Sequence, residues 1–513
     1  MPIGSCNLIC EGTGNDMEFI STRDKSKRVT AAQAIVQGIS EEGGLFVPEK
    51  FPQISAEQLD KLAGMAYPQR AEYILSEFLT DFTRAELYEC VNGAYNERTF
   101  DTRYIAPTVK LSDTTYLLEL WHGPTAAFKD MALQLLPRLM STSAKKVADG
   151  KKIVILVATS GDTGKAALEG FKDVENTEII VFYPEKGVSP MQKLQMVSQE
   201  GGNVHVCGID GNFDDAQSGV KQIFTGSMKN QLAQKGMMYS SANSINWGRL
   251  APQIVYYFSA YCDLLNNEEI ALGDKVNFVV PTGNFGNILA AYYAKKMGLP
   301  VGKLICASNS NRVLTDFFKT GSYDRNRDFH VTKSPSMDIL ISSNLERLLF
   351  DLYECDDKAV AALMEQLKNE GNYTVSQAVK AKADEFFWGG CCSDKETADE
   401  LKDCFDRYGY LMDTHTAVAL KVYRDYVKES GDSTKTVIAS TANPYKFSGA
   451  VLSAVRGQDV KADSDFELVD MLEQATKCPV PENLASLRSK AARFTDSCAK
   501  DGLESYVKGI LGL

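Results

Sequence analysis

Short hydrophobic runs alternate with amphipathic stretches along most of the chain. The run Lys152–Ala158 is continuous and rich in β-branched residues, and similar runs recur at five later places. Strands that are buried on both faces of a parallel sheet have this composition. The runs predict six strands: Lys152–Ala158, Glu178–Tyr183, Val204–Cys207, Val276–Val280, Lys303–Ser308 and Thr436–Ser440.

Helical periodicity follows several of these strands, for example over Lys165–Phe171, Pro190–Glu200 and Ile288–Met297. Alternation of strand and helix predicts βαβ units, so the fold class is α/β with doubly wound parallel sheets. We expect a loop over Gly208–Phe213. Residues 342–405 are charged and helical in pattern, and we expect Trp388–Gly390 to form a turn within them.

The first hundred residues have a different pattern. Apolar residues at helical spacing occur over Ala31–Gly38, Ser55–Phe78 and Arg84–Ala94, separated by polar turns. We therefore expect a mostly helical N-terminal module over residues 1–103. It is followed by a catalytic body over residues 104–513, which comprises two α/β lobes and the helical elaboration at about 342–405.

Charge and cysteine usage narrow the function. The 55 basic and 67 acidic residues give a net charge of −12, which argues against nucleic acid or an anionic membrane as the main partner. The 12 cysteines and 4 histidines show no zinc-binding spacing, so we expect no metal. No secretory signal or long apolar segment is present, and we expect a cytoplasmic protein without a membrane span.

One lysine, Lys129, stands in a stretch that is otherwise poor in charge, Trp121–Asp130. Apolar residues at helical spacing follow it as far as Met140, and Pro137 predicts a kink or two short helices there. A lysine at the apolar start of a helix loses hydration, which favours its neutral amine and its use as a nucleophile or base. The alternative is a lysine that reaches from the helix end to solvent.

Three loops at predicted strand ends have a composition suited to ligands. Gly283–Asn287 combines two glycines with a helix start, which suits a phosphate group; a tight turn is the alternative. Thr159–Gly164 is rich in hydroxyls and suits a carboxylate, or serves only to cap a helix. Ser440–Phe447 offers Thr441, whose hydroxyl could contact a ring nitrogen.

Two further observations lead to a cofactor. Arg249 lies among amide and hydroxyl side chains in Asn243–Arg249 and could bind a phosphate through two hydrogen bonds; a surface or interface arginine is the alternative. A desolvated lysine together with a neutral phosphate loop suggests pyridoxal phosphate, because that cofactor needs both an amine and a phosphate anchor. A nucleotide-binding loop is disfavoured, because Thr159 and Ala166 break the Walker pattern.

Taken together, the motifs resemble those of threonine synthases, pyridoxal-phosphate enzymes of fold type II, in their longer-chain branch. The resemblance covers nearly the whole chain. It rests on Phe19–Arg23, Gly43–Pro48, His122–Asp130, Ser160–Gly164, Asn243–Arg249, Gly283–Asn287, Ser334–Asp338 and Thr441–Phe447.

The resemblance implies a role for each candidate site residue. Lys129 would be the Schiff-base lysine and the catalytic residue, and Thr441 would face the cofactor's ring nitrogen. The cofactor phosphate would be held by Gly283, Asn284, Phe285, Gly286 and Asn287. The substrate carboxylate would be bound by Thr159, Ser160, Asp162 and Thr163, and the substrate phosphate by Asn243, Ser244 and Arg249. Many fold type II enzymes have Asn where Asp162 stands here, which leaves the role of this position open.

The implied reaction converts O-phospho-L-homoserine and water to L-threonine and phosphate, the last step of threonine biosynthesis, in a monomer or homodimer. Another fold type II enzyme, such as a serine/threonine dehydratase, is the main alternative, and it would need no second phosphate site. A threonine-synthase-like protein without this activity is a further alternative.

Overall fold

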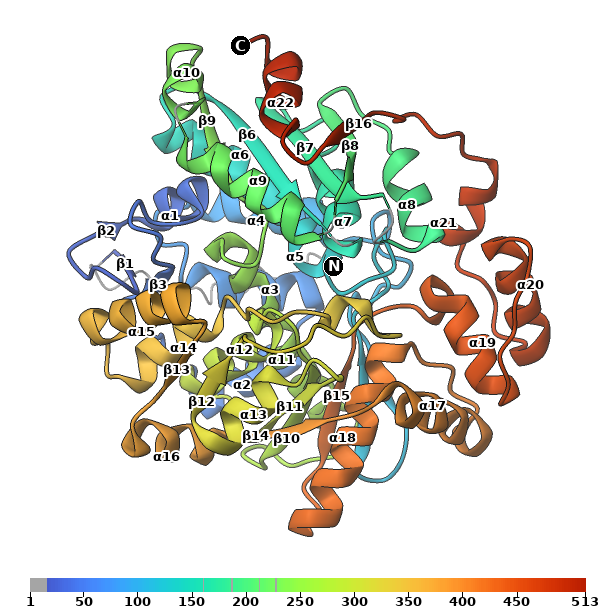
Figure 1. Cartoon of the computed structure of the whole chain (residues 1–513). Helices are drawn as coiled ribbons and strands as arrows, with labels where there is room; N and C mark the ends of the chain where they lie inside the picture. The colour runs from blue at the N-terminus through green and yellow to red at the C-terminus, as the bar shows by residue number, and fades with distance from the viewer. Residues whose placement is uncertain (1–15, 160, 186–187, 212, 227) are drawn as a thin grey trace, which may run out of the picture.

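The computed structural model describes residues 16–159, 161–185, 188–211, 213–226 and 228–513. Two α/β lobes face each other, and the N-terminal module packs beside them (Figure 1). We call the lobe built on the five-stranded sheet the first lobe and the lobe built on the six-stranded sheet the second lobe. The predicted fold class, α/β of fold type II with doubly wound lobes, is confirmed.

The first lobe contains a sheet with strand order β16-β8-β7-β6-β9, in which every pair of neighbours is parallel. Its strands are β6 (Lys152–Ala158), β7 (Thr177–Pro184), β8 (Val204–Asp210), β9 (Met237–Ser240) and β16 (Ser497–Ala499). Its helices are α7 (Asp162–Phe171), α8 (Pro190–Val197), α9 (Phe213–Thr225), α10 (Met228–Gln234) and α22 (Leu503–Leu511). The two strands β6 and β7 are almost entirely buried, as their continuous apolar sequences require.

The second lobe contains a sheet with strand order β14-β11-β10-β15-β5-β4, parallel except for the edge pair β4 and β5. Its strands are β4 (Thr108–Lys110), β5 (Thr115–Glu119), β10 (Val276–Pro281), β11 (Val301–Ser308), β14 (Phe387–Cys391) and β15 (Thr436–Ser440). A separate pair is β12 (Ser322–Asp324) and β13 (Asn372–Thr374). Its helices are α11 (Trp247–Asn266), α12 (Gly286–Lys296), α13 (Val313–Thr320), α14 (Leu345–Leu352), α15 (Asp357–Glu370), α16 (Gln377–Phe386), α17 (Asp394–Tyr408), α18 (Thr414–Ser430) and α19 (Ser448–Arg456), with short 3-10 turns η1 (Pro335–Met337) and η2 (Pro444–Phe447).

The N-terminal module joins a small antiparallel sheet to four helices. The sheet comprises β1 (Phe19–Ser21), β2 (Arg28–Val29) and β3 (Phe46–Pro48), and the helices are α1 (Ala31–Gln37), α2 (Ala56–Ala63), α3 (Tyr67–Ser76) and α4 (Arg84–Ala94). Helices α1, α2 and α4 each begin at a Ser or Thr that caps the third backbone N–H, with Gln or Glu returning the contact. The buried Arg70 guanidinium fixes α3 on α11 through Asp263, 2.8 Å away.

After α19 the chain returns to the first lobe. It passes through α20 (Asp465–Thr476), α21 (Glu482–Ala485) and η3 (Ser486–Ser489) before β16 joins the edge of the five-stranded sheet. This path is the red segment along the right and top of Figure 1. Among the described residues, no helix is long and apolar enough to cross a membrane.

The structure corrects two local predictions. Trp388–Gly390 does not form a turn but lies in β14, which pairs with β11 in parallel register. Its two glycines had suggested a turn, yet tertiary pairing overrides that local preference. Gly208–Asp210 likewise continues β8 instead of starting a loop. The predicted break at Pro137 is confirmed: α5 (Asp130–Leu133) ends before α6 (Leu136–Val147), which carries this proline in its first turn.

Candidate active site

A cavity of about 250 Å³ lies between the lobes, where the carboxyl ends of β6, β10 and β15 come together. Loops at this edge precede helices α7 and α12, whose first-turn N–H groups have no partners within the helix. Twelve of the sequence-predicted site residues line this single cavity: Lys129, Thr159, Thr163, Asn243, Ser244, Arg249, Gly283, Asn284, Phe285, Gly286, Asn287 and Thr441.

Lys129 precedes α5 at the end of a loop held by the second lobe. The N–H of Phe128 donates to the carbonyl of Thr441, 2.8 Å away, and Ala126 adopts a positive φ of 57°. A non-glycine residue in this region is uncommon and is strained unless its surroundings hold it. The Lys129 ammonium makes no hydrogen bond or salt bridge with any described residue, and burial lowers the pKa of its side chain to about 8.

Charged neighbours adjust this pKa in both directions. Arg249 and Lys446 lower the pKa of Lys129 further, whereas Asp162 opposes them by favouring the charged ammonium. The lysine therefore lies close to the balance between amine and ammonium near neutral pH, which suits a group that takes up and releases protons.

The loop Gly283–Asn287 forms a compact cradle between β10 and α12. Phe285 caps α12 with a left-handed backbone, φ 65°, and its buried ring packs 5.7 Å from that of Phe387 on β14. A side chain at Gly283 would come within 2.8 Å of the carbonyl oxygen of Ser336, so only glycine fits there. The cradle is thus fixed on both sides by packing.

Arg249 is a second cationic group in the cavity. It is 4% exposed, and burial lowers the pKa of its guanidinium to about 10. Its Nη1 donates to the carbonyl of Ala242 at 2.5 Å, and no described carboxylate forms an ion pair with it. Buried arginines are normally paired, so this one is suited to an anionic ligand.

The loop after β6 is mostly engaged in holding itself together. The Thr159 hydroxyl accepts the N–H groups of Gly161 and Gly164 at 3.0 and 2.9 Å, while Thr163 also lines the cavity. Ser160 lies outside the described residues.

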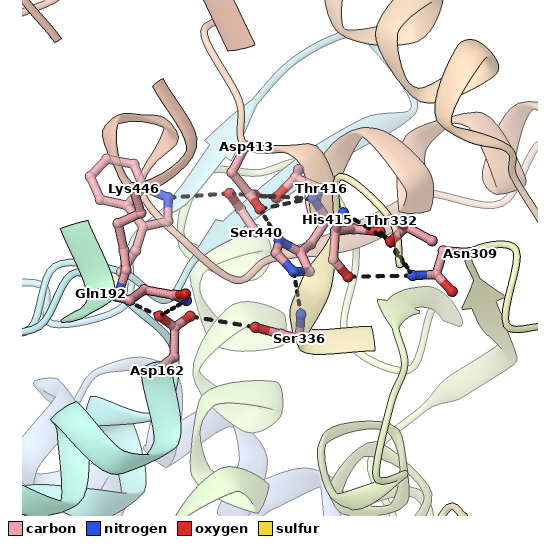
Figure 2. A network of polar contacts seen from close by, with 12 residues as sticks. Asp162, Gln192, Asn309, Thr332, Ser336, Asp413, His415, Thr416, Ser440 and Lys446 are labelled. Atoms are coloured by element: carbon pink, nitrogen blue, oxygen red, sulfur yellow. Dashed lines mark hydrogen bonds and ion pairs between the residues drawn. The ribbon is translucent and has the colours of Figure 1, made fainter. Parts of the chain in front are cut away.

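Asp162, the remaining predicted substrate residue, lies behind the cavity wall. Its Oδ1 is 2.8 Å from the Lys446 ammonium and accepts Gln192 Nε2 at 3.0 Å (Figure 2). Burial alone would raise the pKa of Asp162, but Lys446 and Lys129 hold it well below its usual value. The carboxylate is therefore ionised and occupied by protein donors.

Several residues of this region were not predicted from the sequence. Lys446 pairs with Asp162, while Ser336, Met337 and His415 line the cavity. The only sequence signal for Ser336 and Met337 was the family motif Ser334–Asp338, to which no role was attached.

The residues present fit pyridoxal phosphate. The side-chain amide nitrogen of Asn287 is buried without a hydrogen-bond partner, and it lies at the start of α12 beside the glycine cradle. Helix N-termini with free donors bind phosphate groups. Lys129 lines the same cavity and is available as the amine that this cofactor requires. Among the described residues, no group of three or more His, Cys, Asp or Glu could hold a metal ion.

Three family models match successive parts of the chain. The threonine synthase N terminus matches residues 18–95, the pyridoxal-phosphate-dependent enzyme family matches residues 104–441, and the threonine synthase C-terminal family matches residues 416–507.

Individual proteins show the same similarity. Threonine synthase-like 1 of Macaca fascicularis is 41% identical over 515 residues, covering 96% of this chain and 68% of its own length. Threonine synthase of Pseudomonas aeruginosa is 38% identical over 475 residues, covering 92% of this chain and 97% of its own. The crystal structure of pyridoxal-phosphate-bound threonine synthase from Brucella melitensis superposes with a TM-score of 0.85 at 37% identity, covering 96% of this chain and 99% of that one.

Proposed function

The chain belongs to the threonine synthase family of pyridoxal-phosphate-dependent enzymes, and we propose that it converts O-phospho-L-homoserine and water to L-threonine and phosphate. One observation carries the choice of substrate. The cavity lining offers two features that suit an anion, the Gly283–Asn287 cradle and the guanidinium of Arg249. One suits the phosphate of the cofactor, which leaves the other for a phosphorylated substrate.

Each part of the cavity has a role in this proposal. Gly283, Asn284, Phe285, Gly286 and Asn287 would hold the cofactor phosphate, and Thr441 would contact the ring nitrogen. Because a threonine hydroxyl carries no charge, it leaves that nitrogen largely neutral. When bound, pyridoxal phosphate supplies an electron sink for the charge that develops at the substrate Cα.

Lys129 performs the proton transfers. As a neutral amine it removes the proton from the substrate Cα, and as an ammonium it returns a proton later. Its lowered pKa, about 8, makes both forms accessible near neutral pH. A further proton loss at Cβ allows phosphate to leave from Cγ. A proton is then added at Cγ, which becomes the methyl group of threonine, and water adds its hydroxyl at Cβ.

Arg249, with Asn243 and Ser244, holds the substrate phosphate. A buried guanidinium stabilises the negative charge that grows on the leaving phosphate, because little water competes for it. The loop of Thr159, Ser160 and Thr163 takes the substrate carboxylate.

We assign Asp162 a different role from its neighbours in that loop. Its carboxylate is ionised and paired with Lys446, so it would repel the carboxylate of a substrate instead of binding it. It instead supplies the negative charge that keeps Lys129 from losing its proton too readily.

The test is incubation of the purified holoenzyme with O-phosphohomoserine, with phosphate and amino acid products measured together. We expect equal amounts of phosphate and threonine. Arg249→Ala should raise KM for O-phosphohomoserine by about tenfold or more, since a charge-assisted contact contributes about 1.5–3 kcal/mol. Arg456→Ala, at an exposed site on α19, is the matched control and should change nothing.

Other products would point elsewhere. If phosphate and a 2-oxo acid were formed in place of phosphate and threonine, the substrate phosphate site would be supported and the addition of water would be refuted. Turnover of serine or threonine, unaffected by Arg249→Ala, would favour a dehydratase. The division into residues 1–103 and 104–513, a cytoplasmic location and a monomeric or homodimeric state also remain proposals, which limited proteolysis, cell fractionation and light scattering can test.

A further inference from the structure

His415 lies beside the cavity at the first turn of α18 and is 2% exposed. Its Nδ1 is 2.6 Å from Oδ2 of Asp413, the residue that caps this helix. On the other side of the ring, the backbone N–H of Ser336 points at Nε2 from 3.1 Å (Figure 2). The imidazole therefore connects the start of α18 to the turn η1.

These contacts define the protonation state of the ring. The Ser336 N–H can only donate, so Nε2 of His415 must accept and cannot carry a proton. The ring proton then lies on Nδ1 and is donated to Asp413. The same carboxylate accepts the backbone N–H groups of His415 and Thr416 at 2.8 and 3.2 Å, and the Thr416 hydroxyl as well. An imidazolium would direct a second N–H against that of Ser336.

The turn held by His415 forms part of the active-site wall. The Ser336 carbonyl oxygen lies only 2.8 Å from where a Cβ of Gly283 would be, so η1 rests directly on the cradle loop. The Ser336 hydroxyl lies 3.5 Å from Oδ2 of Asp162, a residue of the first lobe. The position of η1 thus affects both the cradle and Asp162, the carboxylate that neighbours Lys129.

Other contacts fix the ends of this segment. Asp338 accepts Thr332 and two asparagine side chains, Asn309 and Asn311, at 2.7, 2.7 and 3.0 Å. Asn309 also donates to the Ser334 carbonyl at 3.3 Å. At the central residue, Ser336, the backbone N–H is held by His415.

We propose that His415, as the neutral Nδ1–H tautomer oriented by Asp413, is a positioning residue that holds η1 against the Gly283 cradle. The proposal rests on the proposed function only in assigning that cradle to the cofactor phosphate. No proton transfer to substrate is assigned to His415; it acts through Ser336.

Two substitutions at this position separate the hydrogen bond from the ring's volume. His415→Phe keeps the ring volume and removes both the acceptor for Ser336 and the donor to Asp413. His415→Gln retains an amide oxygen that can reach the Ser336 N–H. We expect His415→Phe to raise the dissociation constant of pyridoxal phosphate by about tenfold, the effect of leaving one partly buried N–H unpaired. His415→Gln should recover most of that loss. Equal affinity in the wild type and both variants, or a loss that Gln does not repair, would overturn the proposal.

A second measurement needs neither cofactor nor activity. The chain has 4 histidines, so ¹⁵N-histidine labelling gives few side-chain signals, and the signal missing in His415→Gln identifies His415. We expect a protonated Nδ1 and an unprotonated Nε2 at neutral pH. A proton on Nε2 would refute the tautomer and with it the mechanism, even if His415→Phe fails to fold. Both readouts hold if O-phosphohomoserine is not the substrate, which would refute the proposed function alone.

Discussion

The ammonium of Lys446 lies 2.8 Å from Oδ1 of Asp162, and their side chains are 0% and 3% exposed. The lysine also donates to the carbonyl of Thr125, 2.8 Å away, on the loop that leads to Lys129. Asp162 begins α7 in the first lobe, whereas Lys446 belongs to η2 in the second. This single ion pair therefore connects the two lobes beside the proposed catalytic lysine.

Removal of one partner from this pair should be costly. Lys446→Met leaves the Asp162 carboxylate buried without its main cation, and we expect the free energy of unfolding to fall by about 3–5 kcal/mol. Urea denaturation of the cofactor-free protein measures the change. The double variant Asp162→Asn/Lys446→Met should be more stable than Lys446→Met alone, because it leaves no unpaired charge.

An exposed pair provides the control for this experiment. Lys402 and Asp406 are 2.9 Å apart on α17, and their side chains are 44% and 56% exposed. Lys402→Met should lower the free energy of unfolding by less than about 1 kcal/mol. Similar losses for Lys402→Met and Lys446→Met would contradict a special role for burial.

Lys129 should react as an amine at lower pH than other lysines. Because burial lowers its pKa to about 8, acylation of Lys129 in the cofactor-free protein should be half-maximal near pH 8. Surface lysines, with a pKa near 10.4, should reach half-maximal reaction about two pH units higher. Peptide mass spectrometry after brief labelling across a pH series distinguishes them. A Lys129 profile identical to that of the surface lysines would refute the predicted desolvation.

His122 should make the stability of the protein depend on alkaline pH. Burial favours its neutral form, but the carboxylates of Asp101 and Glu119 prevail and raise its pKa from 6.5 to about 9. Since the folded state binds this proton more tightly, the stabilisation is complete below pH 6.5 and is lost as the pH rises through 9. We expect a loss of about 1–2 kcal/mol, less than the full linkage value, because the Asp101 side chain is 53% exposed.

Urea denaturation at pH 6.5 and 9.5 tests this dependence, with His122→Asn as the comparison. The variant should lose less stability than the wild type between the two pH values. If both lose the same amount, other groups are responsible.

Gly283→Ala should weaken the cradle through steric overlap. The new methyl group would lie 2.8 Å from the Ser336 carbonyl oxygen and 3.5 Å from the Met337 Cα, both backbone atoms that cannot rotate away. Overpacking of this kind costs about 1–3 kcal/mol, so the dissociation constant of pyridoxal phosphate should rise by about fivefold to 150-fold. Absorbance titration with the cofactor measures it. Gly509→Ala, which meets no atom within 4 Å, should leave the constant unchanged.

Much of the architecture follows from local sequence. The buried runs at Lys152–Ala158 and Thr436–Ser440 coincide with β6 and β15, because an uninterrupted β-branched run can be satisfied only inside a sheet. The glycine loop and Lys129 stood out because each departs from its surroundings in composition. That these groups share one cavity could be expected from their positions at strand ends.

The missed features depend on contacts between distant parts of the chain. Lys446 lies in the loop after β15 that also contains Thr441. Its partner, Asp162, belongs to the other lobe, and no neighbouring residue in the sequence indicates this pairing. The only signal near His415 in the sequence is the helix-capping Asp413. The second contact of His415, Ser336, is distant in the sequence and could not be predicted from it. Trp388–Gly390 has the local sequence of a turn, and only its pairing with β11 shows that it belongs to a strand.

The strand order of the second lobe has a consequence for synthesis on the ribosome. The residues around Lys129 are made early, yet Ala127 bridges Ala442, and β5 pairs with β15 (Thr436–Ser440). The pocket therefore cannot close until β15 and Ala442 have been synthesised, and Lys129 stays outside its finished surroundings until then. Acquisition of the cofactor in its final site must consequently follow synthesis of β15, and nascent chains that stop before this strand should be unable to retain the cofactor.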